Sequence, residues 1–77
     1  MNLQPIGTEQ PAIDVETRNE GSIFLFSPLT PDAHNWFAAN IGDEAQWFCG
    51  QLIVEWRYAE SIANGLINDG LVVKAVR

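Results

Sequence analysis

Apolar and polar positions change their period several times along this chain, and each change predicts an element. In residues 12–17 apolar and charged side chains alternate, which is typical of a half-exposed strand. Residues 22–27, SIFLFS, are apolar on both faces, as in a strand inside a sheet. A short connection containing Gly21 separates the two runs, so the pattern predicts a hairpin. Pro28 ends the second run because proline cannot donate to a sheet ladder.

The period becomes helical after Thr30. Thr30 is a good N-cap residue, and Pro31 suits the first helical position, where its missing N–H costs nothing. The apolar stripe that follows has helical spacing and consists of Ala33, Trp36, Phe37 and Ile41. We expect Gly42 to end this helix in the left-handed conformation.

Residues 46–55 predict one further strand, with Cys49 inside it as a small buried apolar side chain. Gly50 marks either a bulge or a close approach of another backbone. Residues 51–54 are its most apolar part and predict a strand that both helices pack on.

A second helix is predicted over residues 56–69. Its apolar side carries Ala59, Ile62, Ala63, Leu66 and Ile67. Gly65 within it costs about 1 kcal/mol relative to alanine unless another residue packs closely there. Gly70 should end this helix, with Leu71 folding back on Leu66. Residues 71–76 then predict a last strand, in which Lys74 marks an edge or an open face.

These elements predict a single small α/β or α+β domain over residues 12–77, preceded by a flexible tail over 1–11. The expected order is an optional first strand, then strand, helix, strand, helix and strand. We expect a three- to four-stranded sheet with two helices packed on one face. The other face of the sheet would be left exposed, covered by the N-terminal segment, or buried against a partner. Its strands are so apolar that full exposure is the least favoured of these.

Size and charge narrow the function. A chain of 77 residues buries a small core, and small domains without disulfides or metals often gain stability by association. The net charge of −6 argues against direct binding to nucleic acid and to anionic membranes. The negative charge either favours docking on a basic protein surface or only keeps the protein in solution. The N-terminus lacks the pattern of a signal peptide, and a single cysteine fits a reducing compartment, so we expect a cytoplasmic protein.

Catalytic chemistry finds little support in the residues. Cys49 and His34 are the types of a nucleophile pair, but Cys49 has no basic neighbours to activate its thiol. The pairs Asp43–Glu44 and Glu55/Glu60 are more typical of solvated charge than of acid–base catalysis. One histidine and scattered acids do not form a metal site, and no glycine-rich turn leads into a helix to hold a phosphate. We therefore expect no catalytic residue, no cofactor and no metal.

The aromatic residues point to binding. Trp36 belongs to the core stripe of the first helix, whereas Trp47 and Trp56 lie at the two ends of the strand. Tryptophan, tyrosine and arginine are the types most often found at binding hot spots, and residues 55–58, EWRY, bring them together. The candidate partner-binding residues are Asp43, Glu44, Glu55, Trp56, Arg57, Tyr58 and Glu60.

Residues 22–73 carry the pattern PLTP…W…VExRY…I..G…DGLxV. It resembles a recurrent pattern in small uncharacterised proteins of bacteria and mobile elements. In type (small, acidic, single-domain, without a catalytic set) the chain also resembles phage-encoded inhibitors of host defence such as anti-CRISPR proteins. That likeness implies a protein that occupies the nucleic-acid site of a basic partner.

The sequence thus predicts a non-enzymatic acidic binding module that blocks or regulates a basic, nucleic-acid-binding partner. One alternative is a structural or regulatory homodimer of the antitoxin type, which would use the open face of the sheet. A small enzyme built on Cys49 is the third hypothesis.

Overall fold

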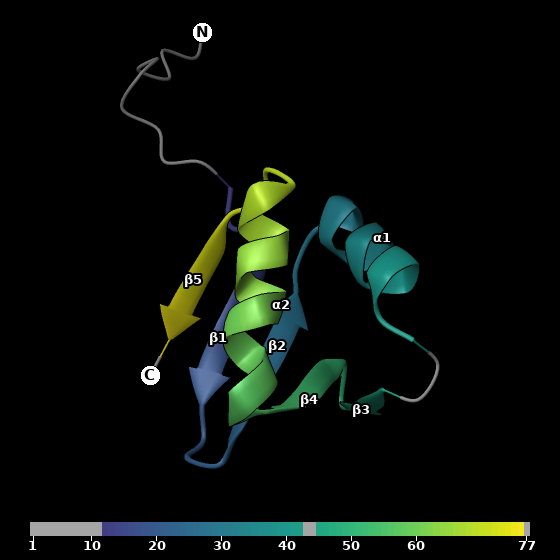
Figure 1. Ribbon diagram of the computed structural model, residues 1–77. Helices are drawn as coiled ribbons and strands as arrows, with labels where there is room; N and C mark the ends of the chain where they lie inside the picture. The colour runs from purple at the N-terminus through teal and green to yellow at the C-terminus, as the bar shows by residue number, and fades with distance from the viewer. Residues whose placement is uncertain (1–11, 43–44, 77) are drawn as a thin grey trace, which may run out of the picture.

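The computed structural model describes residues 12–42 and 45–76, which form five strands and two helices (Figure 1). In chain order these are β1 (Val15–Asn19), β2 (Ile23–Pro28), α1 (Pro31–Asn40), β3 (Gln46–Phe48), β4 (Gln51–Glu55), α2 (Trp56–Asn68) and β5 (Val73–Val76). The tail expected over residues 1–11 lies outside the described residues.

The strands form one mixed sheet in the order β3-β4-β2-β1-β5. Strand β5 runs parallel to β1, and the other neighbouring strands are antiparallel. The apolar strand β2 lies at the centre, as its two apolar faces predict. The α+β class is confirmed, but the expected three to four strands are wrong: the described residues form five, because residues 46–55 make two strands instead of one.

A tight turn divides residues 46–55 into the hairpin of β3 and β4. Phe48 pairs with Gln51, so Cys49 and Gly50 form a two-residue loop. Their φ angles of +53° and +78° are both positive, as a type I′ hairpin turn requires. The predicted burial of Cys49 is therefore wrong, since its side chain is exposed at the hairpin tip. Cys-Gly is not among the residue pairs by which such turns are usually predicted.

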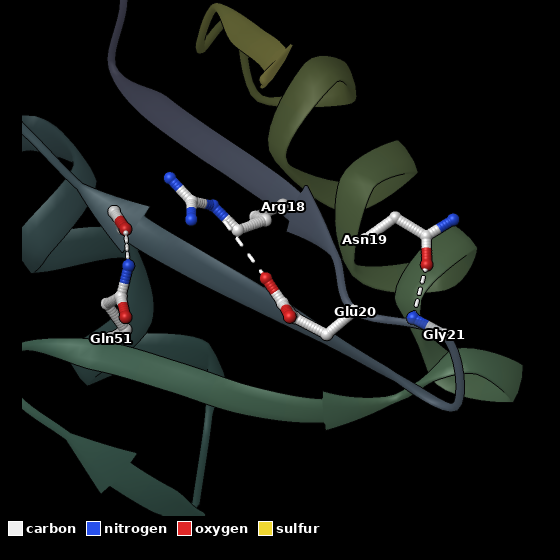
Figure 2. A network of polar contacts seen from close by, with 6 residues as sticks. Arg18, Asn19, Glu20, Gly21 and Gln51 are labelled. Carbon is white, nitrogen blue, oxygen red and sulfur yellow. Dashed lines mark hydrogen bonds and ion pairs between the residues drawn. The ribbon is translucent and has the colours of Figure 1, made fainter. Parts of the chain in front are cut away.

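The predicted first hairpin is confirmed, although β1 begins at Val15 and not at residue 12. Asn19 Oδ1 accepts a hydrogen bond of 2.8 Å from the Gly21 N–H, and Gly21 has a φ of +96° (Figure 2). An exposed ion pair joins Arg18 to Glu20 at 3.9 Å in the same turn (Figure 2). The sequence between the two apolar runs therefore reverses the chain by local hydrogen bonding.

The hydrophobic core lies between one face of the sheet and the helices α1 and α2. Val15, Phe26, Leu52 and Val54 rise from the sheet, and the helices add Ala33, Phe37, Ala59 and Leu66. The rings of Phe26 and Phe37 meet edge to face with centroids 6.4 Å apart. Burying one such phenylalanine stabilises the fold by roughly 1.5–3 kcal/mol.

Helix α1 begins as predicted and ends differently. Thr30 is its N-cap, and Thr30 Oγ1 accepts a hydrogen bond of 3.1 Å from the Ala33 N–H. The expected left-handed ending at Gly42 is wrong. The chain instead leaves the helix in extended conformation at Ile41, whose N–H donates to the Phe37 carbonyl.

Helix α2 ends as predicted. The Leu71 N–H donates to the Leu66 carbonyl and the Gly70 N–H to the Ile67 carbonyl, with Gly70 at a φ of +88°, which together make a Schellman ending. This ending turns the chain directly into β5.

Another residue packs closely on the glycine inside α2, which is the condition that offsets the cost of a glycine in a helix. A Cβ atom at Gly65 would lie 3.1 Å from Trp36 Cζ2, so the missing side chain lets α1 approach α2. Trp36 Nε1 also donates a hydrogen bond of 2.6 Å to Asp69 Oδ2. The structural role predicted for Trp36 therefore agrees with its position between the helices.

The opposite face of the sheet carries mixed side chains. Ile23, Leu25, Ile53 and Phe48 point away from the helices, as do Glu16 and Lys74, which are cross-strand neighbours. Leu25 and Ile53 are half-buried against their neighbours, whereas Phe48 is 66% exposed. Gln51 Nε2 donates to Ser27 Oγ at 2.9 Å on this face (Figure 2). Within residues 12–42 and 45–76 no element covers it.

Asp14 joins three segments that are distant in sequence. Its carboxylate accepts a hydrogen bond of 2.7 Å from Thr30 Oγ1 and one of 2.9 Å from the Val72 N–H. Its backbone N–H donates to the Val72 carbonyl, and its carbonyl accepts from the Leu29 N–H. The Thr30 hydroxyl, and then the Val72 N–H, hold the pKa of this carboxyl below its ordinary value of 3.8.

We expect Asp14→Asn to lower the melting temperature at neutral pH and to weaken its dependence on acid. A depressed pKa contributes stability that is present above pH 3.8 and is lost as pH falls through the lower pKa of the folded state. Thermal unfolding from pH 7 to pH 2 should therefore show a smaller loss for the variant than for the parent chain. Glu20→Gln, which changes an exposed turn carboxylate, is the control. Parallel curves for the parent chain and Asp14→Asn would contradict the assignment.

Candidate functional site

The first turn of α2 presents most of the residues that the sequence singles out. Strand β4 runs into the helix without a loop, so Glu55 is both the last strand residue and the N-cap. The Trp56 N–H donates to the Ser22 carbonyl at 3.0 Å, which fixes the start of the helix against the β1–β2 turn. Trp56 is 61% exposed and Tyr58 is 56% exposed, so the two large aromatic side chains are open to solvent.

These residues do not form one patch, because successive side chains on a helix point about 100° apart. Trp56 and Glu60, four positions apart, lie on the side of α2 that faces β1 and β5. Tyr58 lies on the other side, above a hollow of about 310 Å³ that reaches Ile41 near the end of α1. Arg57 points between them and stays 3.6 Å from Glu55 in an exposed ion pair. The structure thus brings together Trp56 and Glu60 and separates them from Tyr58.

An apolar groove of about 480 Å³ lies between α2 and the β1–β5 side of the sheet. Figure 1 shows α2 crossing the sheet with β5 beside it. The wall of the groove is the α2 side chains of Trp56, Ala59, Glu60, Ala63 and Ile67; its floor is Thr17, Phe24, Phe26, Val73 and Ala75. Glu60 is the charged side chain in this lining. We call this feature the α2–β5 groove.

Sequence reasoning missed most of the α2–β5 groove. Ala63 and Ile67 were assigned to the core side of α2. Ala63 packs partly buried against the core and also lines the groove, whereas Ile67 is 56% exposed. The groove could have been inferred from the apolar face of α2, because this face is wider than a sheet beneath the helix can cover. The floor residues had no local signal, since they meet only through the order of the strands.

The acidic residues divide into a structural group and an exposed group. Asp14 and Asp69 accept the hydrogen bonds from Thr30 and Trp36 described above, so their carboxylates hold the fold together. Glu55 and Glu60 are exposed at α2. Asp43 and Glu44, which the sequence proposes as binding residues, lie outside the described residues.

Cys49 and His34, the two residue types of a nucleophile pair, lie on separate elements. His34 is exposed in α1, and the exposed Cys49 is at the β3–β4 turn. Across the described ranges, no three His, Cys, Asp or Glu side chains gather where they could hold a metal ion. In those ranges, too, no helix has the length and apolar character needed to cross a membrane.

No family model matches the chain, and neither the curated proteins nor the solved structures contain a match to it. The candidate site is therefore defined by the geometry of α2 and the α2–β5 groove alone.

Proposed function

We propose that this protein is a non-enzymatic acidic binding module that blocks or regulates a basic, nucleic-acid-binding protein. The observation that carries the proposal is Trp56, which is 61% exposed at an apolar groove that Glu60 also lines, on a chain of net charge −6. Exposed tryptophan beside an apolar hollow is typical of a binding hot spot. The acidic charge would steer a basic partner toward it.

The mechanism we propose is occupancy. Carboxylates at the start of α2 take the place of phosphates on the partner's basic surface, and Trp56 supplies apolar contact that phosphates lack. In its most specific form this is the action implied by the resemblance to anti-CRISPR proteins, in which the inhibitor competes with nucleic acid. The exposed Glu55 and Arg57 would rearrange at little cost, because an exposed ion pair contributes about 1 kcal/mol or less.

The immobilised chain should retain a nucleic-acid-binding protein from a cell lysate, and double-stranded DNA should displace it. Salt at about 1 M, where charges are screened within about 3 Å, should also release it. A variant with Glu55, Trp56 and Arg57 all changed to alanine should retain at least tenfold less, since hot-spot losses exceed about 1.4 kcal/mol.

The matched control changes Arg18, Glu20 and Phe48 to alanine, because it removes another exposed ion pair and another exposed aromatic side chain. It should retain the partner as the parent chain does. Equal retention by the Glu55/Trp56/Arg57 variant, or a retained partner that DNA does not displace, would refute the proposal.

A homodimer is the second candidate, and the exposed Phe48 favours it. Phe48 lies on the same uncovered face as Leu25 and Ile53, and 66% of it is exposed to solvent at the β3 edge. A dimer through this face would give twice the chain mass of 8.6 kDa by light scattering. Phe48→Lys should then restore the monomer without lowering the melting temperature of the protomer. A parent chain of 8.6 kDa at high micromolar concentration excludes this candidate.

A further inference from the structure

The side of α2 that lines the α2–β5 groove has the spacing of a helix-packing seam. Trp56, Glu60, Ala63 and Ile67 follow one another at intervals of four, three and four residues. This is the spacing by which one helix presents side chains to another helix lying alongside it. This side overlaps the core stripe of α2 at Ala59 and Ala63, whereas Trp56, Glu60 and Ile67 are exposed.

The groove runs along α2 from Trp56 to Ile67 and is open on one side, although its volume of about 480 Å³ is also within the range of small-ligand pockets. From Trp56 to Ile67 the rise of α2 is about 16 Å, which is three turns of a neighbouring helix. The small side chain of Ala63 near the middle permits close approach. In the described ranges no element closes the side of the groove beyond the edge strand β5, so the groove is open there. Small-ligand pockets instead enclose about 70–90% of their ligand. The open side leaves room for a helix to lie along α2.

Glu60 determines the charge of the occupant. Its carboxylate belongs to a lining that is otherwise apolar apart from Thr17, and covering it without a counter-charge would be costly. A lysine or arginine on the docked helix would meet it. A second copy of α2 fits poorly, because an antiparallel pair related by a two-fold axis at the middle of the seam would place Glu60 opposite Ala63 and cover both Glu60 carboxylates without a counter-charge.

We propose that the α2–β5 groove binds a basic amphipathic helix of a partner protein, packed alongside α2, with its apolar stripe over Phe24, Val73 and Ala75 and a cationic side chain at Glu60. This rests on the proposed function and specifies which part of the partner is bound. Trp56 closes one end of the groove over the docked helix. The bound helix adds a third helix to the helical layer.

The probe is a labelled, helix-stabilised peptide of about 15 residues, with leucines at heptad a and d positions and lysines at the flanking positions. Binding is measured by fluorescence anisotropy, and the site is mapped by amide chemical shifts. There are two control peptides. One has the same composition in scrambled order, and the other has glutamates in place of the lysines. The basic amphipathic peptide should bind and shift groove residues, and both controls should bind at least tenfold more weakly.

Variants of the chain locate the peptide. Ala63→Phe fills the groove and Ala75→Arg places a positive charge in it, so each should weaken binding at least tenfold. Ala38→Phe, on an exposed position of α1, is the control for the first. Glu60→Gln should weaken binding severalfold, while Glu20→Gln, with the same change in net charge, should not. Thermal unfolding checks that each variant folds. If Ala63→Phe does not fold, Ala75→Arg still tests the groove, because Ala75 is exposed.

Several results would overturn the helix proposal. These are no binding of the basic peptide at millimolar concentration, equal binding of the scrambled or acidic peptide, or binding unchanged by Ala75→Arg and Glu60→Gln. If the peptide fails while the Glu55/Trp56/Arg57 variant still loses the captured partner, the helix proposal falls and the binding module stands. If the peptide binds in the groove while capture is unaffected by that variant, the proposed function falls and the groove assignment stands.

Discussion

The fold depends on burying its large apolar side chains on a single face of the sheet. Phe26 and Leu52 rise from neighbouring strands and meet Phe37 of α1 and Leu66 of α2. Apart from Pro28, every buried apolar residue of the described chain belongs to this one cluster, so α1 and α2 must share the sheet between them. Trp36 sets their separation by packing on Gly65, and Asp14 fixes the starts of α1 and β5 against β1.

This one-sided arrangement leaves apolar surface in two places. On the face away from the helices, the apolar side chains are partly covered by one another and lie beside the polar pair Glu16 and Lys74. On the helical face, α2 has a wider apolar surface than the sheet beneath it covers, and the remainder lines the α2–β5 groove. The groove therefore combines exposed apolar surface, a large aromatic side chain and a free carboxylate, which is the combination expected for a basic amphipathic partner.

Features with local causes could be predicted from the sequence. The Thr30 cap, the turn at Gly21 and the Schellman ending at Gly70 each depend on residues within one turn of each other. The β3–β4 turn was missed because Cys49 rarely adopts positive φ, although the Gly50 that follows it does so readily. The floor of the groove could not be predicted, since it requires β5 to pair with β1 across 58 residues of chain between Asp14 and Val72. The partnership of Trp56 with Glu60 was predictable from their spacing.

The α2–β5 groove can receive a partner only if it is open to solvent in the free protein. Methyl NMR with a soluble paramagnetic gadolinium chelate measures this directly, because the broadening of each methyl signal reports its access to solvent. We expect strong broadening for Ile67 and Ala75, and almost none for Ala33 and Leu66, which are 0% exposed. If the methyl groups of Ile67 and Ala75 are as protected as those of Ala33 and Leu66, the groove is already filled and cannot be a free docking site.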